Sequence, residues 1–200
     1  YAHSGHRGYD QALVALAVGG AMGVPVVYEV RGFFEALWTS DVARSEQAEL
    51  FRLRRAVETA CMRQAAAVTT LSESMREDIV EPDGVDPERV FVLPNGVRPE
   101  ELAPRPRRPE LVEQLGLDGA FTFGYVSNLD HPREGQELLV EAVQRLRQNG
   151  LPATALVVGE GVRGAELREL ARRRGVEEHV VFTGAVDHDL VGDYYALLDV

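Results

Sequence analysis

The sequence predicts an α/β protein with two parallel sheets, each in a Rossmann-like unit. Two observations lead to this fold class. Strand-like and helix-like segments alternate along nearly the whole chain, which is typical of parallel sheets covered by helices on both faces. A stretch rich in Pro and Arg, PEELAPRPRRP at 99–109, interrupts this alternation and favours neither helix nor sheet. We therefore expect a first domain over 1–103, a linker over 104–109 and a second domain over 110–200.

Short apolar runs bounded by turn residues predict the strands. In chain order they are YAHSGH at 1–6, VVYEV at 26–30, AAVTTL at 66–71, RVFVLPN at 89–95, FTFGYVSNL at 121–129, ATALVVG at 153–159 and HVVFTGAV at 179–186. The first of these resembles the end of a strand. In parallel α/β sheets the carboxyl ends of the strands carry the ligand sites, so the residues after each run are the candidates for function.

Apolar residues spaced three and four apart predict the helices between these strands. They cover 10–22, 44–66, a segment from Ser72 or Ser74 to just before Asp83, 134–148, 165–175 and a last helix that ends at Val200. Either serine can cap its helix, and Ser74 would form a capping box with Glu77. Asn149 and Gly150 end the helix over 134–148.

Composition and charge exclude several classes of function. The net charge of -11 argues against a broad grip on nucleic acid, which needs a basic surface to neutralise phosphates. No apolar run is long enough to span a membrane. The 21 basic residues are all Arg, so Schiff-base chemistry on Lys is excluded, while forked Arg donors suit bound anions. Cys61 shares a helical apolar stripe with Leu50, Leu53 and Val57, which predicts a core thiol rather than a nucleophile and fits a reducing compartment.

The sequence Gly159-Glu160-Gly161-Val162-Arg163-Gly164 has the form G-x-G-x-x-G between a strand and a helix. Such glycines let a backbone approach a diphosphate, with the helix N–H groups pointing at it. A dinucleotide site also needs an acid about 20 residues further on, and Asp187 is the nearest candidate. Three interpretations stay open: a dinucleotide site, a phosphate site for another nucleotide, or glycines that only allow a tight turn.

Two acidic or histidine pairs could bind a metal ion. Asp187-His188-Asp189 has the D-x-D form of metal-dependent sugar-transfer enzymes of a different fold. Alternatively, Asp187 caps the final helix and Asp189 lies at its positive end. His3 and His6 are three positions apart, but no third ligand at a recognisable spacing supports a metal site, so a polar loop at a strand end is the alternative.

The stretch VVYEVRGFFEALW places Glu29, Arg31 and Glu35 around a strand end beside several aromatic residues. This combination suits a sugar or another acceptor, because sugar faces stack on rings while hydroxyl groups bond to acids and Arg. An ion pair beside an aromatic core cluster is the equally open alternative. Pro94-Asn95-Gly96-Val97 forms a turn that could face an interdomain cleft.

Six motifs and a Pro-rich crossing occur in a characteristic order. TTLSESMREDIV, RVFVLPNGV, a Pro-rich crossing, GYVSNL with EGQELLVEA, ALVVGEG, VVFTGAV and DYYALLDV make the chain resemble a retaining family 4 glycosyltransferase of the GT-B fold, among the glycosyl transferases group 1. VYEVRG resembles the acceptor-side domain of a subset of this family. The resemblance covers almost the whole chain. It implies two Rossmann-like domains with parallel sheets that face across a cleft, both incomplete in this chain.

The resemblance also implies a function. The second domain would hold a nucleoside diphosphate sugar, the first would hold a sugar or lipid-linked acceptor, and transfer would retain the anomeric configuration without a metal or another cofactor. Gly159 and Gly161 would line the nucleotide, and Val186 would lie near the base. We expect a role in polysaccharide or glycolipid assembly, in the cytoplasm or peripherally at the inner membrane face. The alternative is a non-catalytic nucleotide-binding module or an NAD-type dinucleotide-binding module.

Two departures from the family pattern affect the site. The family has Gly-Arg at the first strand end of the donor domain and Lys before the next Gly, whereas this chain has Ser127-Asn128 and Arg133-Glu134. We expect Arg133 to be the local cation, Ser127 and Asn128 to supply neutral hydrogen bonds, and the helix starting near Glu134 to add positive potential.

The family's paired glutamates would fall beyond Val200, which predicts an internal piece of a longer enzyme. Arg31 and His3 are then the candidates for catalytic residues within the chain. No metal site is assigned.

Overall fold

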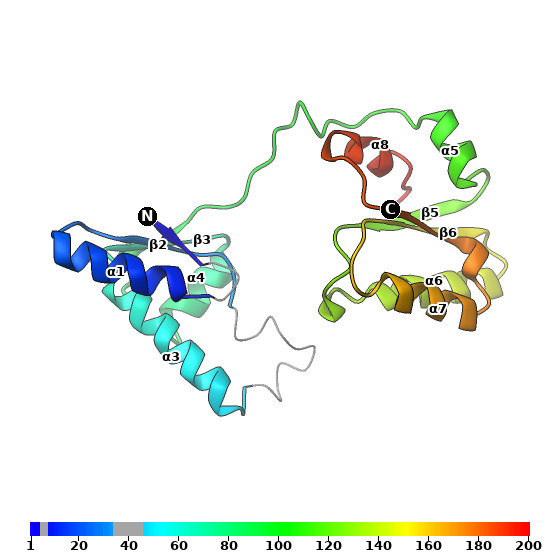
Figure 1. The fold of residues 1–200 in the computed structure, drawn as a ribbon. Coiled ribbons are helices and arrows are strands. Elements are labelled where there is room, and N and C mark those ends of the chain that lie inside the picture. The colour runs from blue at the N-terminus through cyan, green and yellow to red at the C-terminus, as the bar shows by residue number, and fades with distance from the viewer. Residues whose placement is uncertain (5–7, 34–45) are drawn as a thin grey trace. The chain divides into compact units, whose positions relative to one another are not determined.

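The computed structural model describes residues 1–4, 8–33 and 46–200, and only the backbone of Arg133. The chain divides into two compact units, Tyr1–Gly96 and Val97–Val200 (Figure 1). Each described unit contains a parallel sheet, so the predicted α/β class with parallel sheets is confirmed. His6 and Glu35, which the sequence marked as candidate polar residues, lie outside the described residues.

The described part of the first unit holds a four-stranded sheet in the order β1-β2-β3-β4, with every neighbouring pair parallel. Its strands are β1 (Ala2–His3), β2 (Val27–Val30), β3 (Ala67–Thr70) and β4 (Val90–Val92), and its helices are α1 (Asp10–Met22), α3 (Glu49–Gln64), α4 (Glu73–Val80) and the 3-10 turn η1 (Pro87–Arg89). Each predicted strand of this unit is confirmed, although the strands are shorter than the apolar runs.

The described helices of the first unit all pack on one face of its sheet (Figure 1). Tyr28, Val30 and Val68 point to that face and form one core with residues of the three helices. The expectation of helices on both faces is therefore wrong for the described part of this unit. Right-handed crossovers, the nearly universal hand, place successive helices on the same face when the strands follow one another in sequence order.

The second unit holds the parallel sheet β5-β6-β7. Its strands are β5 (Phe121–Val126), β6 (Ala153–Val158) and β7 (Val180–Gly184), and its helices are α5 (Pro109–Leu115), α6 (Gln136–Gln148), α7 (Gly164–Arg173) and α8 (Val191–Tyr195), with the 3-10 turns η2 (Pro132–Glu134), η3 (Glu177–His179) and η4 (His188–Leu190). Helix α6 ends at Asn149 and the left-handed Gly150, as the sequence predicted.

Helices cover both faces of the second sheet. Every residue of β6 is buried, and its side chains alternate between two cores. Ala155 and Val157 pack with α6 and α7, whereas Leu156 and Val158 pack with α5 and α8 (Figure 1). The strand-end loops of this unit are therefore held between two packed layers.

The apolar stripe predicted around Cys61 is only partly present in α3. Cys61 is buried as predicted, and burial together with the nearby Glu58 carboxylate raises the pKa of its thiol to about 11. Leu50 and Leu53, however, are 56% and 57% exposed, so the proposed stripe does not extend along all of α3. Hydrophobic spacing alone does not show where the sheet stops covering a helix.

The predicted helix ends also need correction. Ser72 caps α4 by accepting a hydrogen bond from the Met75 backbone N at 3.3 Å, whereas Ser74 lies inside the helix, so the capping box is wrong. The last helix ends at Tyr195 rather than at Val200. Helix α5 directly follows the Pro/Arg-rich stretch and was not predicted, because its seven residues are too few to show a clear apolar period.

The Pro/Arg-rich stretch is fixed to the second unit by carboxylates near the end of the chain. Nη1 of Arg105 and Nη1 of Arg108 lie 2.9 and 3.0 Å from the two carboxylate oxygens of Asp193. Arg107 pairs with Asp199, which also accepts a hydrogen bond from the Thr122 backbone N at 2.8 Å. These contacts explain why residues after Gly96 group with the second unit.

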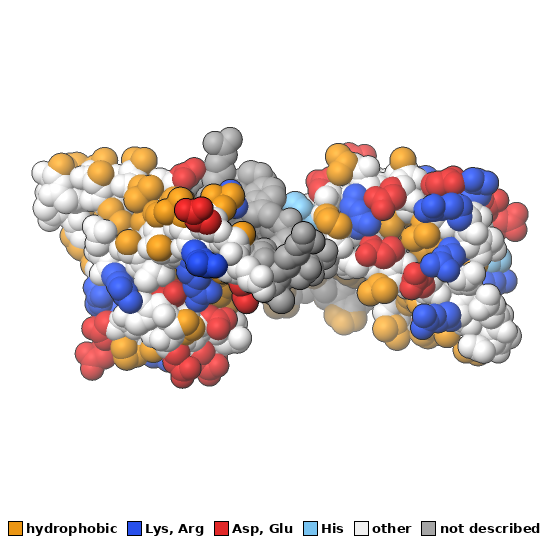
Figure 2. Space-filling view, turned by 90° about the horizontal axis from the view of Figure 1, so that it is seen from below, with side chains coloured by type: hydrophobic (Ala, Val, Ile, Leu, Met, Phe, Trp, Pro, Cys, Tyr) orange, Lys and Arg blue, Asp and Glu red, His pale blue; other side chains and the backbone are white. Residues whose placement is uncertain are grey.

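The surface over α6 and α7 mixes acidic and basic side chains (Figure 2). Arg172 pairs with Glu169 at 2.7 Å, and Arg174 pairs with Glu141 at 3.0 Å. This mixture leaves no large surface of one sign on the side of the second unit seen in Figure 2. Across the described ranges, the helices are too short or too polar to cross a bilayer.

Acid should weaken the contact between the Arg-rich stretch and α8. Hydrogen bonds from Arg105 and then Arg108 lower the pKa of Asp193 below its ordinary value of 3.8. A depressed carboxylate pKa adds stability above the unfolded pKa, and that stability is lost as the pH falls through the folded value. Chemical denaturation should therefore show a loss of stability below pH 3.8 that is smaller in Asp193→Asn. Asp189→Asn is the control, and equal pH profiles for the two variants would contradict the assignment.

Candidate functional site

The candidate site of the second unit is the edge of the sheet where β5, β6 and β7 end. The Gly159 backbone N donates to the Gly184 carbonyl at 2.9 Å, which joins the ends of β6 and β7. The Ser127 backbone N donates to the Val158 carbonyl at 3.1 Å, which joins the ends of β5 and β6. Ligands of open α/β sheets bind at this edge, so three loops from distant parts of the sequence form the site.

The loop between β5 and α6 lies directly on the turn between β6 and α7. The Leu129 backbone N donates to the Glu160 carbonyl at 2.9 Å, and the Leu129 carbonyl accepts from the Arg163 backbone N at 3.1 Å. The Asp130 carboxylate accepts from the Val162 backbone N at 3.0 Å. The two loops thus form one hydrogen-bonded layer, and separating them would break these three bonds.

This packing gives the glycines of the G-x-G-x-x-G stretch a structural reason. Gly159 has a φ of +135°, and a Cβ there would overlap the Ser127 carbonyl oxygen. A Cβ on Gly161 would lie 2.5 Å from both the Leu129 carbonyl carbon and an Asp130 carboxylate oxygen. The tight-turn interpretation therefore has direct support. The contacts of Gly159 and Gly161 with a nucleotide stay a prediction.

Ser127 and Asn128 are exposed at the end of β5, where the sequence placed neutral hydrogen-bond donors. The Asn128 backbone carbonyl accepts from the Tyr125 hydroxyl at 3.3 Å, and the side-chain Oδ1 of Asn128 accepts from the Asp130 backbone N at 3.5 Å. Arg133 belongs to the turn η2, but its side chain lies outside the described part.

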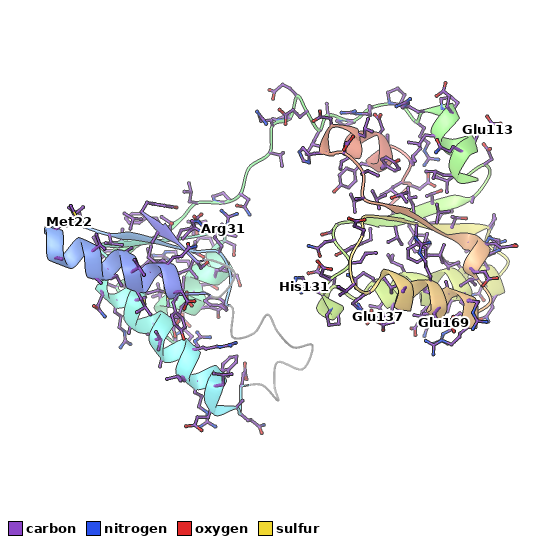
Figure 3. The ribbon with its side chains drawn as sticks, in the orientation of Figure 1. Met22, Arg31, Glu113, His131, Glu137 and Glu169 are labelled. Atoms are coloured by element: carbon purple, nitrogen blue, oxygen red, sulfur yellow. The ribbon has the colours of Figure 1, made fainter. Side chains whose placement is uncertain are left out.

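The helix of this loop begins later than expected. Gly135, at a φ of +68°, separates η2 from α6, so the helix starts at Gln136 rather than near Glu134. Figure 3 labels His131 in the loop and Glu137 in the first turn of α6. The N–H groups at the start of this helix therefore belong to Gln136 and the residues that follow it.

Arg163 connects the two helices that begin at the site. Its Nη1 donates to the Gln136 Oε1 at 2.6 Å, and its Nη2 lies 3.2 Å from the Glu137 carboxylate. Burial lowers the pKa of Arg163, but hydrogen bonds to Glu166 and Glu137 outweigh burial and hold the pKa above its usual value. Arg163 stands at a variable position of the glycine motif, so the motif itself gives it no role. The Glu166 three residues later was the available signal.

Val186 and the two aspartates follow β7. Val186 is partly buried against the core formed with α5 and α8. Asp187 directly precedes η4 but makes no side-chain cap hydrogen bond, so the alternative that Asp187 caps the final helix is wrong. In the described ranges, no cluster of three or more His, Cys, Asp or Glu side chains could hold a metal ion, and metal independence stays a prediction.

The first unit also gathers polar residues at the ends of its strands. The Arg31 backbone N donates to Ser4 Oγ at 2.8 Å, and the Arg31 Nη2 donates to Asn95 Oδ1 at 3.1 Å. Its Nη1 lies 3.6 Å from a Glu29 carboxylate oxygen, so the expected ion pair is present. Figure 3 shows Arg31 at this edge of the sheet. Sequence reasoning missed Ser4 and treated Asn95 only as part of a turn.

His3 lies beside this cluster but is not joined to Arg31. It pairs with Glu29 across β1 and β2, its ring is exposed, and its Nδ1 lies 3.2 Å from the Ser4 carbonyl oxygen. The structure thus brings both catalytic candidates to one edge of the first sheet. Their catalytic roles stay predictions.

Gly159→Ala should destabilise the second unit strongly. The added Cβ would overlap the Ser127 carbonyl in a backbone conformation that L side chains rarely adopt. We expect a loss of about 3 kcal/mol in the free energy of unfolding, measured by urea denaturation. Gly150→Ala is the matched control because Gly150 has a φ of +80° and open space around it, so we expect about 1 kcal/mol there. Similar losses would show that the contact with Ser127 is unimportant.

Comparisons with known proteins agree with this architecture. Residues 1–96 match the family model described as a glycosyl transferase 4-like domain, and residues 120–200 match the model described as glycosyl transferases group 1. The 2-deoxystreptamine glucosyltransferase of Streptomyces kanamyceticus is 31% identical over 148 residues, covering 72% of this chain and 38% of the relative. The GDP-mannose-dependent alpha-(1-6)-phosphatidylinositol monomannoside mannosyltransferase of Mycobacterium tuberculosis is 38% identical over 109 residues, covering 54% and 28%. The chain spans well under half the length of these two curated relatives.

Solved structures share the fold. HepE of Anabaena, in complex with UDP and glucose, matches with a TM-score of 0.73 at 21% identity, over 98% of this chain and 50% of HepE. WaaG, a glycosyltransferase involved in lipopolysaccharide biosynthesis, matches with a TM-score of 0.63 at 20% identity, over 98% of this chain and 58% of WaaG. The expected GT-B fold is thereby confirmed. With the two family models in sequence order and this fold, the chain belongs to the glycosyl transferases group 1 family.

Proposed function

We propose that the protein transfers a sugar from a nucleoside diphosphate sugar to an acceptor, with the donor held by the second unit. The observation that carries this proposal is the joined pair of loops after β5 and β6, which lead into α6 and α7 at one sheet edge. Helix N-termini carry unpaired N–H groups and positive potential, which suit the phosphates of such a donor.

The leaving diphosphate needs positive charge as the sugar departs, because charge develops on its oxygens in the transition state. Arg163 is already paired with Glu137 and Glu166, so it is poorly placed to supply that charge. We assign this role to Arg133, with neutral hydrogen bonds from Ser127 and Asn128. Hydrogen bonds from a charged group contribute roughly 1.5 to 3 kcal/mol, against about 0.3 to 1 kcal/mol for a helix terminus.

The names of the relatives support this class of donor. One relative is named as GDP-mannose-dependent, and the HepE structure holds UDP and glucose. On this proposal Gly159 and Gly161 line the nucleotide, Val186 lies near the base, and transfer proceeds without a metal ion or another cofactor. Transfer also retains the anomeric configuration, which NMR of the product tests by comparison with the donor.

The first unit would then hold the acceptor. Arg31, held by Ser4, Glu29 and Asn95, places a half-exposed positive charge at the strand ends, and His3 lies on the same edge. These groups suit the hydroxyl groups of a sugar or the head group of a lipid-linked acceptor. We place the reaction in polysaccharide or glycolipid assembly, in the cytoplasm or peripherally at the inner membrane face.

The dinucleotide-binding alternative is not favoured. The relatives described above are named as sugar transferases, and the glycines of the expected fingerprint are accounted for by loop packing. A non-catalytic nucleotide-binding module has no observation of its own in its favour.

Nucleoside diphosphates should stabilise the full-length protein. A ligand that binds only the folded state raises the melting temperature, and at a concentration of 100 times Kd it adds about 2.7 kcal/mol of stability. We expect UDP or GDP to raise Tm in differential scanning fluorimetry, with the same shift after EDTA treatment. NAD serves as the comparison ligand. No shift with either diphosphate would overturn the donor site, and a shift with NAD alone would favour the dinucleotide alternative.

Arg133→Ala should weaken binding of the same diphosphate. Removing a charged hydrogen-bond donor from a phosphate costs about 1.5 kcal/mol or more, which corresponds to a Kd at least about tenfold higher. Isothermal titration calorimetry of the full-length variant measures this change. Arg145→Ala is the matched control, because Arg145 lies in the last turn of α6, the helix that follows the loop with Arg133. Equal affinities for both variants would show that Arg133 does not contact the phosphates.

A further inference from the structure

Arg163 differs from the other ion-paired arginines of α7 in what it joins. Its guanidinium contacts Gln136 and Glu137 at the start of α6, at 2.6 and 3.2 Å, and Glu166 on its own helix at 3.3 Å. Its backbone N donates to the Leu129 carbonyl at 3.1 Å. One residue therefore binds the loop after β5, the first turn of α6 and the first turn of α7.

Burial separates this arrangement from an ordinary surface ion pair. The Arg163 side chain is 12% exposed, whereas Arg172, on the same helix, is 64% exposed and pairs with Glu169 within α7. Surface pairs such as Arg172–Glu169 contribute little to stability, because water screens the charges and the paired side chains lose conformational freedom. The bonds of Arg163 to Gln136 and Glu137 are part-buried and span 27 and 26 positions of sequence, so they fix one helix start against another.

Gln136 adds a second, independent observation. It is 2% exposed, and its Nε2 is buried without a hydrogen-bond partner in the described part of the chain. The Arg163 guanidinium requires an acceptor, so the Gln136 oxygen must face it and the amide nitrogen must point elsewhere. Buried donors are almost always paired in folded proteins, and an unpaired one needs an explanation beyond packing. The amide of Gln136 is held in this orientation by Arg163 at the start of α6.

We propose that Arg163 is a positioning residue for the donor diphosphate, and that it acts through Gln136 and the start of α6. This inference rests on the proposed function. The guanidinium holds the first turn of α6, to which the loop with Ser127 and Asn128 leads, against the start of α7, so it sets where the N–H groups of the two helices lie relative to each other. Without this bridge, only the contacts between the two loops would hold the start of α6 against that of α7, and the two sets of N–H groups would converge less closely on one pair of phosphates.

The test compares Arg163→Gln with Arg172→Gln in the full-length protein, because each change removes the charge of one ion-paired Arg, the first directly before α7 and the second in its last turn. The ligands are UDP and GDP, each beside its nucleoside, uridine or guanosine, with Kd measured by isothermal titration calorimetry. We expect Arg163→Gln to raise the diphosphate Kd about tenfold and to leave the nucleoside Kd unchanged. Arg172→Gln should change neither constant. Arg163→Lys should also weaken the binding of the diphosphate, since one ammonium group cannot reproduce the forked contacts of a guanidinium.

Gln136→Met tests the bridge from its other end and serves where Arg163→Gln fails to fold. It should raise the diphosphate Kd by a similar factor, and the double variant should lose no more than either single variant, because both remove the same contact.

The possible outcomes separate the two proposals. An unchanged diphosphate Kd in Arg163→Gln and Gln136→Met, beside tight binding by the unaltered protein, would overturn the positioning role alone. Equal losses for diphosphate and nucleoside would also overturn it, because they would indicate a general structural role. If the unaltered protein bound neither diphosphate, the proposed function and this inference would both fall.

Discussion

The contact between the Ser127 carbonyl and Gly159 is the constraint on which the strand-end region of the second unit depends. No side chain fits between these two backbones, so the loop after β5 can lie on the turn after β6 only because position 159 is a glycine. Once the loop lies there, the Leu129 carbonyl reaches the Arg163 backbone N and the Asp130 carboxylate reaches the Val162 backbone N. The starts of α6 and α7 are brought together as a consequence.

Arginine has a structural use throughout this acidic chain. Arg105 and Arg108 share Asp193, Arg55 pairs with Asp83 at 2.9 Å, and Arg163 joins α6 to α7. A guanidinium presents several donors in a fixed plane and can therefore bridge two segments at once, which an ammonium group does less well. The positive charge of the described part is largely held close to carboxylates, so an anionic ligand would be recognised by a few local groups rather than by a broad basic field.

The two sheets differ in which faces their helices cover. In both units the strands follow the sequence order. The described helices of the first unit share one face, while in the second unit α5, which precedes β5, and α8, which follows β7, cover the face opposite α6 and α7. The second sheet consequently has a central strand, β6, with every residue buried. A strand buried on both faces is rigid, and rigid strands hold their terminal loops in a defined geometry. The proposed donor site has that support.

The sequence by itself determined the alternation of strands and helices, the parallel sheets and the helix end at Gly150, and it limited the cap of α4 to Ser72 or Ser74, because apolar periodicity and turn chemistry act over a few neighbouring residues. It also identified Ser127, Asn128 and the glycine stretch as residues of strand ends. It did not reveal the exposure of Leu50 and Leu53, the short helix α5 or the place of Arg163. Only the tertiary structure decided these features and the packing of Gly159. The partner of Gly159 lies 32 positions earlier in the sequence, and the partners of Arg163 lie 26 and 27 positions earlier. Local patterns carry no information about which distant loop a residue meets, and packing between the layers supplies it.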